Sequence, residues 1–114
     1  MPTERPLCIY IDVDDTLVCS AGGKRIPNPN LVRRIREWKA QGALLYCWSS
    51  AGADYAQRTA EELNVKDCFV GFLTKPHALV DDQSIHQWAY FIELAPARAE
   101  RSSLSEIREE LDGL

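Results

Sequence analysis

Three apolar stretches of the sequence are each followed at once by a pair of acidic or hydroxyl side chains. The three pairs are Asp12 with Asp14, Ser49 with Ser50, and Asp81 with Asp82. Grouped carboxylate oxygens suit Mg²⁺, which takes hard oxygen ligands and keeps several waters. Hydroxyls and backbone amides beside the start of a helix suit a phosphate, and a carboxylate can attack phosphorus to form an aspartyl-phosphate. These residue types predict metal-assisted phosphoryl transfer, provided that the fold brings the three pairs together.

The segments around these pairs predict alternating strands and helices. Short apolar runs with β-branched residues are typical of buried parallel strands, and apolar residues at helical spacing behind Asn28-Pro29 are typical of a capped amphipathic helix. The predicted strands are 7–11, 43–48, 68–72 and 78–80, and the predicted helices run over about 29–40 and from Gly52 to about Leu63. Such alternation implies a parallel sheet, whose ligands bind beyond the carboxyl ends of the strands. We therefore expect the three pairs to converge on one site.

The rest of the chain is predicted from local signals. Residues 17–27 are predicted to form a loop, and the aromatic and branched residues of 88–94 favour a last strand. Ser103 and Glu106 have the spacing of a capping box, which predicts a terminal helix over about 104–112. The apolar stripe of this helix consists of Leu104, Ile107 and Leu111. That stripe either packs on the chain's own sheet, which favours a monomer, or joins a homodimer, and we favour the monomer.

Composition limits the class of protein. The chain has 114 residues, of which 46% are hydrophobic and 26% charged, and this predicts one ordinary globular domain over residues 1–114. Thirteen basic and 17 acidic residues give a net charge of −4, which argues against a nucleic-acid coat. No stretch approaches the ~20 apolar residues of a membrane span, and the N-terminus has no apolar signal-peptide run. We predict a cytoplasmic protein without a membrane partner.

Cysteine usage agrees with a reducing compartment. The four cysteines are Cys8, Cys19, Cys47 and Cys68. No two of them form a CxxC pair, and with two histidines they form no zinc-ligand pattern. Cys8 and Cys47 lie inside apolar runs, so we predict buried free thiols in preference to disulfides.

Four motifs in order resemble those of the haloacid dehalogenase-like (HAD) superfamily. Residues 9–17, with Asp12, Asp14 and Thr16 after an apolar strand, are similar to the first motif of that superfamily. The others are similar to the second motif at Ser49, the third at Lys75-Pro76 and the fourth at Val80-Asp81-Asp82. The resemblance spans residues 7 to 82, about two thirds of the chain.

The resemblance implies a three-layer α/β/α Rossmann-like domain with a mainly parallel sheet. Because 17–27 leaves room only for a short flap, we expect no cap domain. Asp12 would be the nucleophile, and Asp14 the general acid and base, as in the phosphatase branches. The implied metal set is Asp12, Asp14, Asp81 and Asp82 around Mg²⁺, and the phosphate set is Ser49, Ser50 and Lys75. The substrate would be a phosphate monoester, whose identity no motif names.

Two questions stay open at the level of sequence. Lys75 lies six positions before Asp81, which leaves too few residues for a crossover helix. If 76–80 formed a straight parallel strand, Lys75 would lie at the amino end of that strand, away from the predicted site. Lys24 or Arg25 could then supply the positive charge instead. The alternative function is a regulatory or binding protein of the same fold with weak or no turnover. A response-regulator receiver is a further alternative, but its acidic pair precedes the acceptor aspartate, whereas Asp12 comes first here.

Overall fold

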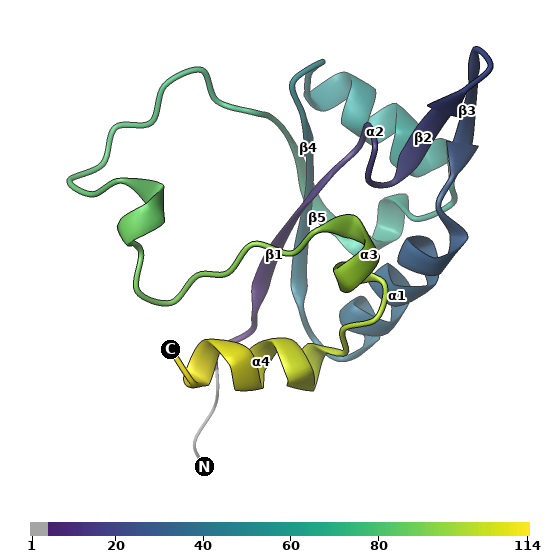
Figure 1. Cartoon of the computed structure of the whole chain (residues 1–114). Helices are drawn as coiled ribbons and strands as arrows, with labels where there is room; N and C mark the ends of the chain where they lie inside the picture. Colours follow the sequence, from purple (N-terminus) through teal and green to yellow (C-terminus); the bar gives the residue numbers. More distant parts are fainter. Residues whose placement is uncertain (1–4) are drawn as a thin grey trace.

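The chain folds as an α/β protein with a parallel sheet, as predicted, but the sheet has three strands, fewer than the sequence predicted (Figure 1). The computed structural model describes residues 5–114. Residues 1–4, which belong to the N-terminal stretch considered above for a signal peptide, lie outside the described residues. The strands are β1 (Cys8–Asp12), β2 (Val18–Ala21), β3 (Lys24–Pro27), β4 (Leu44–Ser49) and β5 (Phe69–Thr74). The helices are α1 (Pro29–Ala40), α2 (Ala53–Glu62), α3 (Pro96–Ala99) and α4 (Leu104–Asp112), with 3₁₀ turns η1 (Lys66–Cys68) and η2 (Ile85–Gln87). Over the described residues, no helix has the length and apolar character needed to cross a membrane.

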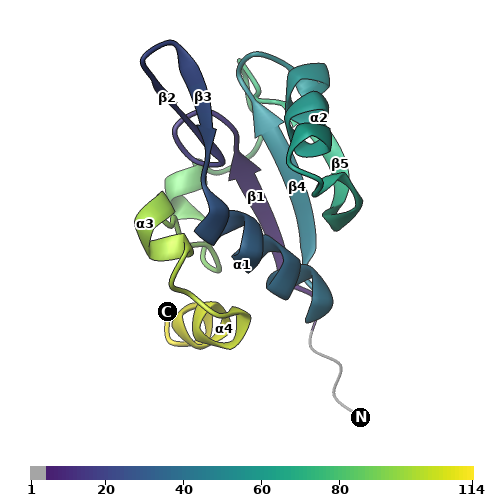
Figure 2. The same ribbon diagram turned by 90° about the vertical axis from the view of Figure 1, so that its right-hand side faces the viewer.

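Helix α1 has the bounds that its local signals predicted. The Asn28 side chain accepts a hydrogen bond of 3.2 Å from the Leu31 N–H, and Pro29 occupies the first turn. The apolar stripe of the helix, which includes Ile35 and Trp38, is buried. Figure 2 shows α1 and α2 lying together over one face of the sheet. The order of the sheet is β1-β4-β5, which places β4 in the middle and β1 at an edge.

The two faces of the sheet differ in burial. Side chains alternate along a strand, so every second residue of β1 and β4 points toward the helices. On that side Ile11, Leu45 and Cys47 are buried. On the other side Tyr10 keeps 46% of its surface exposed and Leu44 keeps 40%. The helices α1 and α2 therefore build the core on one face, and the opposite face stays partly open.

Residues 17–27 form a hairpin instead of the predicted loop. Strands β2 and β3 pair in antiparallel fashion, and Gly22 and Gly23 connect them with φ angles of 57° and 76°. Two successive residues with positive φ are what a tight hairpin turn requires, and glycine adopts that conformation without strain. Arg25 of β3 pairs with Glu62 at 2.8 Å and so ties the hairpin to the end of α2.

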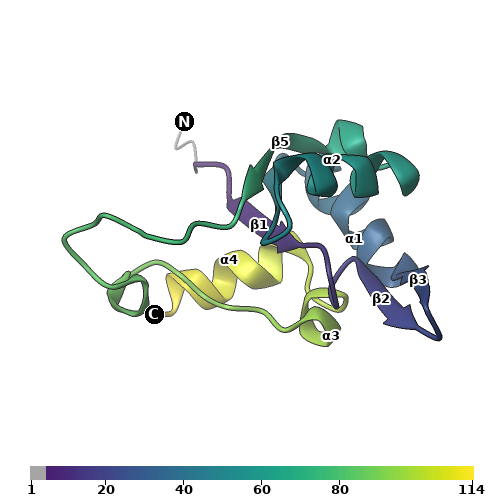
Figure 3. The same cartoon turned by 90° about the horizontal axis from the view of Figure 1, so that it is seen from above.

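The predicted strands 78–80 and 88–94 are both wrong. Between β5 and α3 the structure has no strand, and Figure 3 shows this segment looping outward from the sheet. Local hydrogen bonds occupy the backbone there: the Gln83 N–H donates to Asp81, and Ser84 caps η2. Such side-chain-to-backbone bonds compete with pairing in a sheet. These bonds hold residues 81–88 in a local turn, and among the described residues neither flanking stretch, 78–80 or 88–94, joins the sheet.

Helix α4 has the predicted bounds and packs within its own chain. Ser103 and Glu106 form the expected capping box. The stripe of Leu104, Ile107 and Leu111 is buried in the same core as the sheet. The Trp38 indole N–H also donates to the Ser102 carbonyl at 3.0 Å, which holds the start of α4 against α1. This is the arrangement expected if the stripe packs on the chain itself.

The cysteines are free, but only two of the four are buried. Cys47 and Cys68 are buried, whereas Cys8 and Cys19 are exposed, so the predicted burial of Cys8 is wrong. Cys8 lies on the same side of β1 as Tyr10, where α1 and α2 do not cover the sheet. Burial, together with the nearby Asp12 charge, raises the pKa of Cys47 to about 12.

Thiol labelling should therefore occur in two stages. In the native protein without reductant, Cys8 and Cys19 should react with a thiol reagent, because both side chains reach solvent; partial burial raises the pKa of Cys8, so alkaline pH should speed its reaction. Cys47 and Cys68 should react only after unfolding in denaturant, when all four are counted by mass spectrometry. Four reactive groups in the native protein would contradict the packing of β4 and η1. Fewer than four in denaturant would reveal a disulfide.

Candidate active site

The carboxyl ends of the three parallel strands meet at one edge of the sheet. Asp12 ends β1, Ser49 ends β4 and Thr74 ends β5. The register pairs Asp12 with Trp48, and Ser49 with Thr74, so the last residues of the strands lie at the same level. Sequence reasoning predicted this edge as the site, and the structure brings residues from β1, β4 and β5 together there.

Lys75 reaches the predicted nucleophile. Its ammonium lies 3.0 Å from the Asp12 carboxylate, and both side chains are about one third exposed, at 35% and 31%. The ammonium also lies 5.9 Å from the centre of the Trp48 ring. Strand β5 extends two residues beyond the predicted 68–72, to Thr74, and this places Lys75 at the carboxyl end of the sheet. The doubt about which end Lys75 occupies is thereby removed.

The rival cations lie elsewhere. The Arg25 guanidinium bonds Glu62 at 2.8 Å and the Thr59 hydroxyl at 2.7 Å. Lys24 is exposed on the hairpin formed by β2 and β3. Of the three candidate cations, Lys75 is the one with an ion pair to Asp12.

A tight turn after β1 holds the first motif. Three successive N–H groups, those of residues 16–18, donate to the Val13 carbonyl at 2.9–3.2 Å. Asp15 takes a positive φ of 61°, a conformation that aspartate adopts more readily than most residues. The Thr16 hydroxyl donates to the second oxygen of Asp12 at 3.3 Å. Both oxygens of the Asp12 carboxylate therefore have a fixed partner.

Tyr55 fixes the second aspartate. Its hydroxyl donates to the Asp14 carboxylate at 2.6 Å. This hydrogen bond, and secondarily burial, raises the pKa of Tyr55, because the neighbouring carboxylate favours the protonated phenol. The Arg25 guanidinium lies 5.2 Å from the centre of the Tyr55 ring. Sequence reasoning missed Tyr55, since a tyrosine in the first turn of α2 carries no signal of a partner 41 positions earlier.

Ser49 holds the turn that leads into α2. Its side chain faces the helices with 2% exposed, and its hydroxyl oxygen accepts a hydrogen bond of 3.0 Å from the Ala51 N–H. Ser50 is exposed in the same turn. The Thr74 hydroxyl accepts from the Ala53 N–H at 3.0 Å and so caps α2 from the neighbouring strand, a contact that sequence reasoning also missed. Phosphate binding by Ser49 and Ser50 stays a prediction.

Asp81 and Asp82 do not join this edge. The strand that should deliver them is absent, and both are exposed in the segment between β5 and α3. The Asp81 carboxylate accepts from the Gln83 N–H at 3.0 Å, and that bond lowers the pKa of Asp81. Among the residues that the structure describes, no group of three or more acidic, histidine or cysteine side chains is arranged to hold a metal ion. The expected convergence of three pairs is thus limited to the pairs at β1 and β4.

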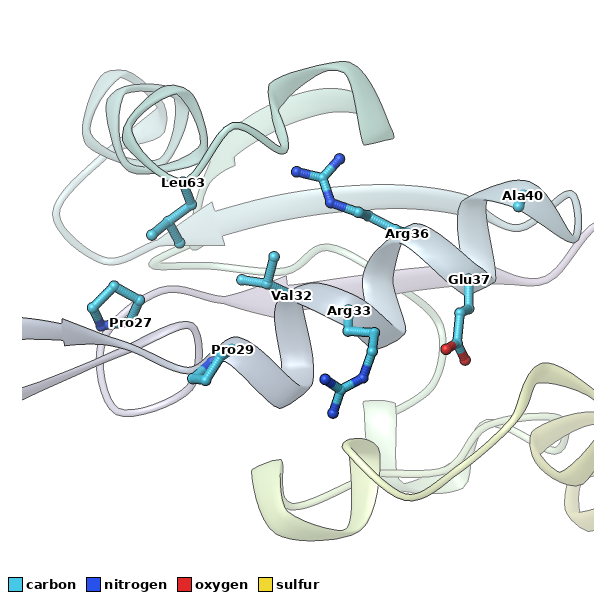
Figure 4. A pocket seen from close by; sticks show the side chains of 8 residues that line it. All are labelled: Pro27, Pro29, Val32, Arg33, Arg36, Glu37, Ala40 and Leu63. Atoms are coloured by element: carbon cyan, nitrogen blue, oxygen red, sulfur yellow. The ribbon is translucent and has the colours of Figure 1, made fainter.

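A surface pocket lies apart from these residues. It has a volume of about 510 Å³ and runs along α1, beside the residue that follows α2 (Figure 4). The lining consists of Pro27, Pro29, Val32, Arg33, Arg36, Glu37, Ala40 and Leu63. None of these belongs to the edge at which Asp12 and Lys75 meet, so the pocket adds no residue to the candidate active site.

Comparison with known proteins supports the fold and gives no information on the activity of the chain. No family model matches the chain, and no curated protein matches it. The chain is similar to the crystal structure of an MCSG target protein from Vibrio cholerae, with a TM-score of 0.56 and 15% sequence identity. The match covers 94% of this chain and 98% of the other, and the description of that protein names no activity. At this identity the likeness is one of fold alone.

Proposed function

We propose that the chain is a phosphatase that hydrolyses phosphate monoesters through an aspartyl-phosphate on Asp12. The proposal takes the protein as a single capless HAD-like domain of three layers, with Mg²⁺ as its cofactor. The observation that carries it is the ion pair of 3.0 Å between Lys75 and Asp12, at the carboxyl edge of a parallel sheet. A carboxylate can attack phosphorus, and a cation fixed beside it can offset the charge of the incoming phosphate.

The chain's own residues can carry both halves of the reaction. An Asp12 oxygen attacks phosphorus, and the bond from phosphorus to the ester oxygen breaks while Asp14 donates a proton to that oxygen. Asp14 then takes a proton from water, which attacks phosphorus and releases inorganic phosphate with Asp12 restored. Tyr55 positions the Asp14 carboxylate through its hydrogen bond of 2.6 Å. Lys75 offsets charge on the phosphoryl oxygens in both halves.

Magnesium is proposed as the cofactor from the resemblance. When bound, it would neutralise charge on the phosphoryl group. Of the ligands that the resemblance implies, the Asp12 carboxylate and the Asp14 carbonyl belong to the turn at the end of β1. Within residues 5–114, however, no third acidic ligand lies with them, because Asp81 and Asp82 lie in the segment that loops away from the sheet. The arrangement of residues therefore does not by itself fit a complete magnesium site.

A regulatory or binding protein of the same fold is the second candidate. The exposed positions of Asp81 and Asp82 favour it, since these are metal ligands that the resemblance implies for a phosphatase and they lie outside the candidate active site. The two candidates differ in one measurement, which is release of inorganic phosphate from a panel of monoesters. Turnover above that of the Asp12→Asn protein supports the phosphatase, and its absence across the panel supports the second candidate.

A panel assay with and without Mg²⁺ should show Mg²⁺-dependent release of phosphate that depends on Lys75. We expect Lys75→Met to lower kcat/KM by about 10²-fold, as removal of one charge-stabilising donor does in other active sites. Lys24→Met is the matched control, because it removes the same charge from the exposed hairpin. Loss of activity in Lys24→Met with full activity in Lys75→Met would contradict the assignment. Equal activity in Mg²⁺ and in a chelator would contradict the cofactor.

A further inference from the structure

Three aromatic side chains form a row on the open face of the sheet. The Tyr10 ring contacts Trp48 edge to face, with ring centres 4.9 Å apart, and contacts Tyr46 with ring centres 5.1 Å apart. The register places Tyr10 beside Tyr46, and Asp12 beside Trp48, on the same side of the parallel pair β1 and β4. We call Trp48, Tyr10 and Tyr46 the aromatic row.

The aromatic row is continuous with the candidate active site. The Lys75 ammonium lies between its two partners, 3.0 Å from the Asp12 carboxylate and 5.9 Å from the centre of the Trp48 ring. A phosphate group drawn to Lys75 would therefore place the rest of its ester next to Trp48 and Tyr10. The charged pair of Lys75 and Asp12 thus lies next to the apolar surface of the aromatic row.

The row is partly accessible. Tyr10 is 46% exposed, whereas Tyr46 and Trp48 are half-buried, and Leu73 of β5, on the same face, is 38% exposed. The two helices that cover the sheet, α1 and α2, lie on the opposite face (Figure 2). The chain passes the open side as the segment between β5 and α3, which loops outward (Figure 3). By comparison Trp38, which belongs to the core, is 1% exposed.

We propose that the aromatic row binds a planar ring of the phosphorylated substrate while Lys75 binds the phosphate. The substrate class is thus a phosphate monoester with an aromatic group one or two bonds from the ester oxygen. This inference rests on the proposed function for its reaction, although binding of the ring can be measured without turnover. Offset or edge-to-face contact between rings adds to the burial of apolar area, and this addition is what distinguishes a ring from an aliphatic group of the same size.

Two esters of matched shape test the proposal. Benzyl phosphate and cyclohexylmethyl phosphate both release a primary alcohol, so their chemical reactivity is similar and they differ in the planarity of the ring. We expect wild-type protein to prefer benzyl phosphate by about three- to tenfold in kcat/KM. The same preference should hold in dissociation constants measured by calorimetry without divalent cation, where no hydrolysis is expected.

Two variants test whether the aromatic row causes the preference for benzyl phosphate. Tyr10→Leu keeps apolar bulk at an exposed position and should bring the ratio of the two esters close to one. Tyr90→Leu is the control, because Tyr90 is an exposed tyrosine, at 53%, in the segment between β5 and α3, and the hydrogen bond that it loses, to Asp112 of α4, lies outside the aromatic row. It should keep the wild-type ratio. The wild-type ratio alone decides the proposal if Tyr10→Leu does not fold.

The outcomes separate this inference from the proposed function. Equal use and equal binding of the two esters by wild-type protein overturn the aromatic row as a ring site and leave the phosphatase standing. Absence of hydrolysis of both esters, with benzyl phosphate bound more tightly, supports the ring site, and the panel of monoesters then decides whether the chain is a phosphatase. A ratio that Tyr10→Leu does not change, or a second copy of the chain that covers the row in solution and blocks both ligands, overturns the ring site.

Discussion

Replacing Asp12 with Asn should abolish turnover and formation of the covalent intermediate, with a loss of at least about 10⁴-fold in kcat, as removal of a nucleophile does in other enzymes. Asparagine keeps the size of the side chain and can still accept the hydrogen bond from Thr16, which is 3.3 Å long in the wild type. It removes the negative oxygen that must attack phosphorus, and it leaves Lys75 without its anionic partner. Phosphate release from an aryl ester, followed by a colorimetric assay, measures the effect.

Asp15→Asn is the control for this experiment. It makes the same chemical change three residues further on, in the same turn, at an exposed side chain. Asparagine tolerates the positive φ of 61° at this position, so the turn should keep its shape. Activity close to wild type is expected. Full hydrolytic activity in Asp12→Asn would exclude Asp12 as the nucleophile.

Replacing Asp14 with Asn should slow turnover by about 10²–10⁴-fold and leave the intermediate to accumulate. The range is that of other general acid-base groups. An aryl phosphate has a good leaving group and needs little protonation, so Asp12 should still be phosphorylated. Water is then no longer activated, and the aspartyl-phosphate persists. Acid-quench mass spectrometry should detect one added HPO₃, about 80 Da, on the peptide that contains Asp12.

The wild type and Asp15→Asn, quenched in the same way, should show less of this adduct, because both keep Asp14 to complete hydrolysis. A variant at Tyr55 separates the role of Asp14 from that of Asp12, since the Tyr55 hydroxyl donates to the Asp14 carboxylate at 2.6 Å. Tyr55→Phe should therefore affect the same step as Asp14→Asn, with a smaller loss. An adduct on a residue other than Asp12 would overturn the assignment of roles.

The elements that could be predicted from sequence are those specified by neighbouring residues. Helix α1 begins where Asn28-Pro29 predicts, and α4 begins at the capping box of Ser103 and Glu106, because caps act within one turn. The bounds of β1 and β4 were predicted to within one residue, since their apolar runs are continuous, but their predicted burial on both faces is wrong because one face of the sheet is partly open. The position of Asp12 and Ser49 at one edge follows from those strands being parallel.

The parts that sequence could not give depend on partners far along the chain. Whether 78–80 forms a strand depends on competition between sheet pairing and local bonds such as that from Gln83 to Asp81. Tyr55 and Thr74 matter through contacts with Asp14 and Ala53, which lie 41 and 21 positions away. Residue type at Tyr55 or Thr74 carries no information about such a partner. The place of Lys75 was open until the length of β5 was known.

The end of β5 has a consequence for how this chain can vary. Thr74 caps α2 on the helix side of the sheet, and Lys75, its immediate neighbour, pairs with Asp12 beside Trp48 on the open side. Adjacent residues of an extended chain point to opposite faces, so Thr74 contacts α2 on one side of the sheet while Lys75 contacts Asp12 on the other. A deletion of one residue within Phe69–Thr74 would exchange the two side chains between the faces and remove both contacts together. Natural variants of this chain should therefore change length within 76–95, and leave the length of β5 unaltered.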